Sequence, residues 1–157
     1  MRPFTPFHAM AAVLVVLAAG SGSAAWAALY PAVDAASSQI SQAVSQAGQQ
    51  HKHVLLDFGA DWCGDCKVLD ANFHRPENSA LLEAGYVVVH VNVGTDGITD
   101  NFSVAEQYGI PLKKGVPALA VLDSNGKLLY AQRNGEFESM RHMDPNSVHD
   151  FLSQWKP

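Results

Sequence analysis

The sequence predicts one α/β domain in which a central mixed sheet of about four strands is flanked by helices. Short apolar runs rich in β-branched residues alternate with segments of helical character, and strands separated by helices need crossover connections. The last two apolar runs are separated only by a tight turn, which predicts a hairpin. The chain has 157 residues, of which 48% are hydrophobic, enough for one domain with its own core.

The first 27 residues are predicted to be an export signal and not part of the domain. Arg2 supplies a positive charge, residues 9–19 form an apolar run, and alanines flank Trp26 in an A-x-A cleavage pattern. The apolar run is short for a membrane span, which takes about 20 apolar residues. We therefore expect cleavage after Ala27, a periplasmic or secreted location, and no stable membrane insertion after cleavage. An uncleaved anchor is the alternative.

The mature chain begins with a segment whose composition differs from that of the domain. Pro31–Gln50 is rich in Ala, Ser and Gln and has apolar residues four apart, which predicts a helix with one narrow apolar stripe, part of it linker. We therefore separate residues 28–50 from the domain proper at residues 51–157. That domain opens with His53–Ala60, a compact apolar run containing one charge, which is typical of a buried strand.

The remaining elements are predicted in order along the chain. Further strands are predicted at Tyr86–Val93, at Pro117–Asp123 and, after a tight turn at residues 124–126, at residues 127–133. Further helices are predicted from Cys63 to the break at Pro76, over residues 77–85, over residues 101–109, and over residues 144–155 with Asp144 as N-cap and Pro145 in the first position. The strands that helices separate are expected to form a parallel core, to which the hairpin adds an antiparallel edge.

The only two cysteines, Cys63 and Cys66, lie three residues apart where a predicted strand runs into a helix. They fit a structural disulfide, a metal clip or a redox catalyst. A disulfide that closes so short a loop removes little chain entropy, which weakens the first interpretation. The start of a helix presents free N–H groups and a partial positive charge, which stabilise a thiolate. Cys63 can therefore attack a substrate disulfide, and Cys66, one turn later, can resolve the mixed disulfide.

The segment Leu55–Lys67, LLDFGADWCGDCK, resembles the strand-to-active-site pattern of the thioredoxin family, and the likeness extends over His53–Trp155. The resemblance implies a thioredoxin-like fold and a thiol-disulfide oxidoreductase. It also implies that Asp57, six residues before Cys63, is a buried carboxylate that moves a proton to or from Cys66. Burial disfavours the charged form of a carboxylate, so this role is physically reasonable. A satisfied polar residue at a strand end is the alternative.

A second segment, KGVPALAVLD, resembles the cis-proline loop of the same family. The resemblance implies a cis bond between Val116 and Pro117, and a backbone at Val116 that pairs with an extended substrate segment as an added strand does. Trp62 is then expected to be a partly exposed ring that helps to cover the substrate. Packing in the core is the alternative role for Trp62.

Two features depart from the family pattern. Gly64-Asp65 stands between the cysteines, where thioredoxins have Gly-Pro, and Asp65 places negative charge near Cys63 with Lys67 as partial compensation. A less stabilised thiolate favours a pair that leans reducing. The segment between residues 93 and 115 is longer than a minimal thioredoxin needs, and we expect a surface loop followed by a helix. The motif and the export signal also resemble the thioredoxin-like domain of the periplasmic electron-transport reductase, which favours a reducing role.

Two further functions stay open. One is an oxidase or isomerase of the same fold. The other is a periplasmic copper or zinc chaperone that uses the C-x-x-C pair with histidine ligands, although a second ligand pair at the usual spacing is missing. The histidines considered for that role are His51, His53, His74, His90, His142 and His149.

Charge and motifs restrict the partners. A formal net charge of −5 argues against a nucleic-acid partner, which would need a basic surface. No glycine-rich phosphate loop follows a strand, so we expect no organic cofactor, and no metal is assigned. The redox group would be the Cys63–Cys66 disulfide itself. The expected partners are protein or small-thiol disulfides and an electron donor that the sequence does not identify.

Overall fold

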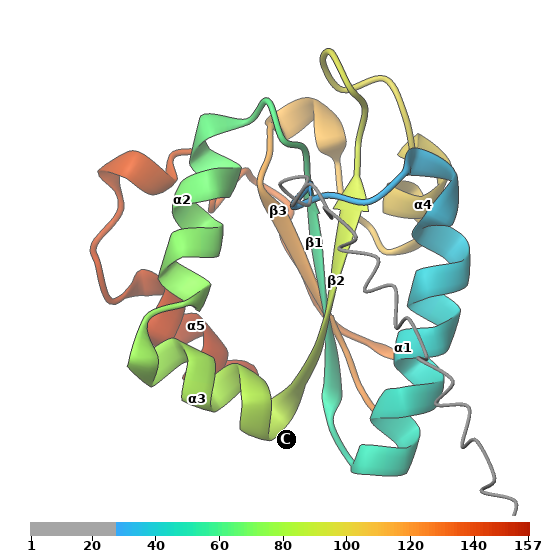
Figure 1. Ribbon diagram of the computed structural model, residues 1–157, viewed down its shortest axis with the longest axis vertical. Helices are drawn as coiled ribbons and strands as arrows, with labels where there is room; N and C mark the ends of the chain where they lie inside the picture. Colours follow the sequence, from blue (N-terminus) through green and yellow to red (C-terminus); the bar gives the residue numbers. More distant parts are fainter. Residues whose placement is uncertain (1–27) are drawn as a thin grey trace, which may run out of the picture.

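The computed structural model describes residues 28–157, and the predicted export signal lies outside the described residues. A four-stranded mixed sheet in the order β2-β1-β3-β4 carries helices on both faces, which confirms the predicted fold class (Figure 1). The strands are β1 (His53–Gly59), β2 (Tyr86–Asn92), β3 (Ala118–Leu122) and β4 (Leu128–Ala131). The helices are α1 (Ala36–Gln50), α2 (Gly64–Phe73), α3 (Pro76–Gly85), α4 (Phe102–Gln107) and α5 (Ser147–Trp155), with 3₁₀ turns η1 (Val33–Ala35), η2 (Leu112–Lys114) and η3 (Met140–His142).

Strand direction differs from the expectation of a parallel core. β1 and β2 are parallel and are joined through α2 and α3, but β3 runs antiparallel to β1, and β4 antiparallel to β3. The connection between β2 and β3 contains only six residues of α-helix, about 9 Å, whereas a seven-residue strand is about 23 Å long. That connection does not return the chain to the far end of the sheet. β3 therefore starts beside the end of β1, where Ala118 pairs with Phe58.

Two layers of helices bury the two faces of the sheet. α1 and α4 lie on one side, and α2, α3 and α5 lie on the other (Figure 1). Successive side chains of β1 point to opposite faces, so Leu56 packs in the cluster under α1 while Leu55 packs with Leu69 of α2 and Leu152 of α5. Both faces of β1 are buried, which explains its continuous apolar run. None of the helices in residues 28–157 has the length and apolarity needed to cross a bilayer.

The start of α5 corrects one predicted cap. The helix begins at Ser147, three residues after Asp144. The Asp144 side chain accepts a hydrogen bond from the backbone N–H of Asn146 at 2.8 Å, and its carbonyl accepts one from Ser147 at 3.0 Å. Asp144 therefore forms a turn that leads into the helix, because an aspartate often bonds its own backbone two residues ahead.

Candidate functional site

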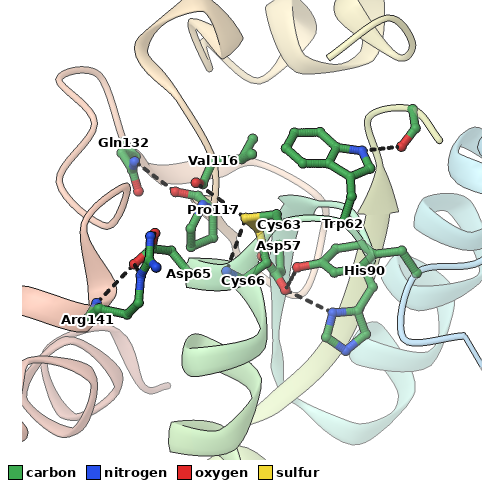
Figure 2. The surroundings of a disulfide bond; sticks show 12 residues. Asp57, Trp62, Cys63, Asp65, Cys66, His90, Val116, Pro117, Gln132 and Arg141 are labelled. Carbon is green, nitrogen blue, oxygen red and sulfur yellow. Dashed lines mark hydrogen bonds and ion pairs between the residues drawn. A yellow bond between two sulfur atoms is a disulfide. The ribbon is translucent and has the colours of Figure 1, made fainter. Parts of the chain in front are cut away.

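The two cysteines lie where β1 runs into α2. Cys63 is the N-cap residue of α2, and its Sγ accepts a hydrogen bond from the backbone N–H of Cys66 at 3.1 Å. The two residues form a disulfide with their Cα atoms 5.3 Å apart (Figure 2). Cys63 is 6% exposed and Cys66 is 0% exposed. Cys63 is therefore the more accessible of the two cysteines, and its role as nucleophile stays a prediction.

The proline loop faces this disulfide. The Val116–Pro117 peptide bond is cis, as the resemblance predicted, and the Val116 carbonyl oxygen lies 3.6 Å from Cys63 Sγ. The antiparallel pairing of β3 with β1 brings the loop there. Gln132, which is 1% exposed, braces the loop: its Nε2 donates to the Pro117 carbonyl at 3.2 Å, and its Oε1 accepts from the backbone N–H of Leu119 at 3.2 Å. The sequence offered no signal for Gln132 beyond a polar residue at the end of a hairpin strand.

Trp62 lies on the opposite side of the disulfide from Pro117 (Figure 2). The residue is 43% exposed, so Trp62 is not a core residue. Its Nε1–H donates to the Gly94 carbonyl at 2.8 Å. This bond joins the ring to the loop after β2, the segment which the sequence identified as longer than expected. The ring and the proline loop thus flank the reactive sulfur.

Asp57 is completely buried in β1 and accepts two hydrogen bonds on one oxygen. Its Oδ2 accepts from the Tyr30 hydroxyl at 2.8 Å and from Nδ1–H of His90 at 2.9 Å. The other oxygen, Oδ1, has no hydrogen-bond partner within residues 28–157. From the sequence alone, His90 is a candidate metal ligand and Tyr30 has no assigned role. The signal for His90 was a lone ionisable residue within the apolar strand YVVVHVNV, which pairs with β1 so that His90 lies beside Asp57.

Gly59 brings the Tyr30 hydroxyl and Cys66 together. A Cβ on Gly59 would overlap that hydroxyl and would lie 2.9 Å from Cys66 Sγ. Glycine is therefore required for the hydroxyl and the sulfur to approach the same point of β1. Because the same hydroxyl donates to Asp57, the Asp57 carboxylate and the buried sulfur of Cys66 both lie close to the Tyr30 hydroxyl.

The surroundings of Asp57 shift the ionisation of both its partners. Burial, and then the charge and hydrogen bond of Asp57, raise the pKa of Tyr30 far above its usual value, so the hydroxyl keeps its proton. Burial alone lowers the pKa of His90, but the hydrogen bond and negative charge of Asp57 outweigh it and leave the pKa raised. The protonated imidazole is therefore favoured more strongly at His90 than in a free histidine.

Asp65, the charged residue between the cysteines, is paired with Arg141 of η3. Its Oδ1 accepts from the backbone N–H of Arg141 at 3.0 Å and from Nε–H at 3.2 Å, and its Oδ2 accepts from Nη2–H at 2.8 Å. The side-chain bonds from Arg141 hold the pKa of Asp65 below its ordinary value. The sequence had assigned this compensation to Lys67. A residue 76 positions away supplies it instead, because the C-terminal segment returns past the start of α2.

The histidines do not gather around the cysteines. Nδ1 of His53 lies 2.8 Å from the Trp155 carbonyl, and Nδ1 of His74 lies 2.8 Å from the Asp70 carbonyl. In the part of the chain that the structure describes, no group of three or more His, Cys, Asp or Glu side chains is arranged to hold a metal ion.

Comparisons with known proteins agree with this geometry. A family model described as thioredoxin-like matches residues 35–124, more than half of the chain. The crystal structure of a disulphide isomerase from Xylella fastidiosa Temecula1 is 33% identical, with a TM-score of 0.76, and the match covers 83% of this chain and 98% of that one. A thioredoxin from Chlamydia caviae is 39% identical over 74 residues, 47% of this chain and 61% of that protein.

A protein disulfide-isomerase from Oryctolagus cuniculus is 28% identical over 105 residues. The match covers 67% of this chain but only 17% of that protein. The chain thus spans less than a fifth of the length of this curated relative.

Proposed function

The chain belongs to the thioredoxin-like family of disulfide oxidoreductases, and from this premise we propose that it is an exported enzyme that reduces protein disulfides through Cys63 and Cys66. One observation carries the proposal. The cysteines form a disulfide at the start of a helix, with the more exposed sulfur, that of Cys63, 3.6 Å from the backbone carbonyl of the proline loop. A sulfur in this position can exchange with a disulfide that lies along the loop.

The mechanism rests on the positions of the two cysteines. In the reduced protein the Cys63 thiolate attacks one sulfur of the substrate disulfide, a mixed disulfide forms, and the first substrate thiolate leaves. Cys66 then gives its proton to Asp57, and its thiolate attacks Cys63 Sγ. The Cys63–Cys66 bond forms as the second substrate thiolate leaves, so two electrons have passed to the substrate. The Val116 backbone holds the extended substrate segment, and Trp62 covers it.

The charges beside the sulfurs support reduction as the direction. Asp65 brings a carboxylate into the turn between the cysteines, and Arg141 neutralises it only in part, because its side chain is 62% exposed to solvent. Within residues 28–157, no hydrogen bond from a cationic side chain reaches either sulfur, and Cys63 Sγ accepts from the Cys66 backbone. A thiolate with modest stabilisation makes the dithiol form a better reductant.

Location and partners complete the proposal. The signal pattern in residues 1–27 supports export to the periplasm or beyond. An external dithiol donor would restore the reduced pair, and the substrates would be protein or small-thiol disulfides. The disulfide serves as the redox group, with no organic cofactor.

Isomerisation is a second candidate. The Xylella protein that is 33% identical along nearly its whole length is described as a disulphide isomerase. Isomerisation would use the same first attack by Cys63, but the substrate's own thiol would then displace Cys63 before Cys66 acts.

Reduction of insulin by dithiothreitol tests the function. We expect the protein to accelerate the reduction, Cys63→Ser to abolish the acceleration, and Cys66→Ser to accumulate a mixed disulfide with the substrate. Two further measurements distinguish reduction from oxidation and isomerisation: the refolding of scrambled ribonuclease, and the reduction potential of the Cys63–Cys66 pair against glutathione. A wild-type protein with no effect on insulin would refute the reductase proposal. A strongly oxidising potential would favour disulfide formation or isomerisation instead.

A further inference from the structure

The buried position of Asp57 creates a problem that the proposed function does not solve. Asp57 is 0% exposed, yet it must gain and lose a proton in every cycle if it serves Cys66. A proton on a group sealed from bulk water needs a relay to solvent, and a side chain within hydrogen-bond reach can supply it. Within residues 28–157, two side chains hydrogen-bond the carboxylate, those of Tyr30 and His90.

Tyr30 cannot provide this route. The residue is 2% exposed, so its hydroxyl does not open to water. The pKa of Tyr30 is raised far above its usual value by burial and by the charge of Asp57, so the hydroxyl does not release its proton. The ring also packs edge-on against His90, with ring centroids 5.3 Å apart. Tyr30 therefore orients the carboxylate and the imidazole and leaves proton exchange to another group.

His90 meets the requirement. Its Nδ1 lies 2.9 Å from Asp57 Oδ2, and its side chain is 23% exposed (Figure 2). His90 lines two surface grooves, one of about 360 Å³ beside α1 and one of about 220 Å³ beside α2 and α3. Its other nitrogen, Nε2, has no hydrogen-bond partner in the described part of the chain. One side of the ring thus contacts the buried carboxylate while another part reaches solvent.

The charges around His90 favour proton exchange there. Asp57 faces the ring from β1, and the groove on the α2 and α3 side is lined by Asp70, His74 and Glu83. The groove on the α1 side has glutamines and no charged residue. Burial lowers the pKa of His90, whereas Asp57 raises it most and Asp70 and Asp61 add to the effect.

We propose that His90 carries the proton between Asp57 and solvent each time Cys66 is ionised or reprotonated. The inference rests on the proposed dithiol exchange. In the reduced protein the ring carries its proton on Nε2 and has a free lone pair on Nδ1. The Cys66 thiol gives its proton to the Asp57 carboxylate, the carboxyl passes it to Nδ1, and the ring releases the Nε2 proton to water. The ring is left with the Nδ1–H that bonds Asp57 in the oxidised protein. The electron pair left on Cys66 Sγ forms the bond to Cys63 Sγ. One proton enters the path from Cys66 and one leaves it to water. When the Cys63–Cys66 disulfide is reduced, protons move along the same path in the opposite direction.

The aromatic disulfide 5,5′-dithiobis(2-nitrobenzoate) separates the two steps, because each releases one coloured thiolate. In stopped-flow mixing with the reduced protein, the first release reports attack by Cys63 and the second reports attack by Cys66. We expect His90→Asn, which keeps a hydrogen-bond donor for Asp57 but cannot carry a proton, to leave the first release unchanged. The second release should slow about tenfold or more, as loss of a proton carrier does, and its pH profile between 5.5 and 8.5 should flatten. Added imidazole should restore part of the rate.

The controls distinguish a failure of the proton path from a failure of the proposed dithiol exchange. His74→Asn removes a histidine from the same groove that does not bond Asp57, and should leave both releases unchanged. A wild-type protein that gives neither release would refute the proposed function. Two normal releases with His90→Asn, or a slowed second release with the wild-type pH profile and no response to imidazole, would overturn the proton path. If His90→Asn does not fold, His90→Gln is measured in the same way.

Discussion

At the scale of single residues, the charge near Cys63 Sγ depends on an ion pair between Asp65 and Arg141, which are far apart in the sequence. Asp65 is held by three hydrogen bonds from Arg141, one of them from the backbone. Lys67 lies two residues from Asp65 on the same helix, but the carboxylate of Asp65 bonds to Arg141 instead. The side chain of Arg141 also lies against Gly64, with Nη1 3.9 Å from the point that a Cβ would occupy. The Asp65–Arg141 pair therefore contributes to the electrostatic potential at the start of α2, where the two cysteines lie.

Removing each partner should shift the redox equilibrium in opposite directions. Arg141→Ala leaves Asp65 uncompensated and destabilises the Cys63 thiolate, so the pair should become more reducing. Asp65→Asn leaves the guanidinium and should make it more oxidising. Each shift should be a few fold in the equilibrium constant with glutathione, as expected for a partly solvated charge. Lys67→Ala is the control and should change it less than Arg141→Ala does; an equal shift would restore the assignment of Lys67 as the compensating charge.

At the scale of elements, α1 is part of the folded core. Ile40, Ala43 and Ala47 are buried in one cluster with the sheet residues Leu56 and Phe58. The narrow apolar stripe in the sequence is thus the face that packs on β1 and β2. The Ala-rich composition allows the helix to lie close to the sheet.

Shortening one side chain of this apolar stripe tests whether α1 packs against the sheet. Ile40 is 4% exposed, and Ile40→Ala should lower the free energy of unfolding by about 2–5 kcal/mol, the usual cost of a cavity left by such a truncation. Urea denaturation of the oxidised protein measures it. Ser41→Ala, on the exposed side of the same helix, is the matched control and should change stability little. A loss below about 1 kcal/mol for Ile40→Ala, well under that usual cost, would mean that α1 behaves as a linker.

At the scale of the whole molecule, the sheet joins the site to both helical layers. β1 carries Asp57 and leads into Cys63, β2 supplies His90, and β3 begins after the proline loop. Charges buried between these layers make the stability of the fold depend on pH. The pair of His90 with Asp57 is the clearest case, since both groups are shielded and 2.9 Å apart.

The sign of this dependence is set by the raised pKa of His90. A group with a folded pKa above its unfolded value, about 6.5 for histidine, contributes stability that is complete below that value and is lost as the pH rises through the folded pKa. The loss of stability caused by His90→Asn should therefore be larger at pH 5.5 than at pH 8.5 in urea titrations. His74→Asn, a change at a ring that is 76% exposed, is the control. A loss that grows toward pH 8.5 would contradict the ion pair.

The sequence by itself determined the order of elements, the mixed α/β class and the C-x-x-C pair that forms the disulfide, because these depend on local signals. Apolar runs, turn residues and the C-x-x-C spacing act over a few positions, and the family resemblance added Asp57 and the cis bond before Pro117. The long polar loop and the exposed Trp62 were also placed correctly. The direction of β3 was not, because it depends on which end of the sheet the connection over residues 93–117 returns to.

Only the tertiary structure decided which side chains surround these residues. Tyr30 and His90 reach Asp57 from 27 and 33 positions away, and Arg141 reaches Asp65 from 76 away. Gln132 braces the proline loop across a hairpin. Such contacts are set by sheet register and by the return of the C-terminal segment, and neither leaves a periodic trace in the sequence. The chemistry of the site is local in the chain, whereas the control of its protons and charges is not.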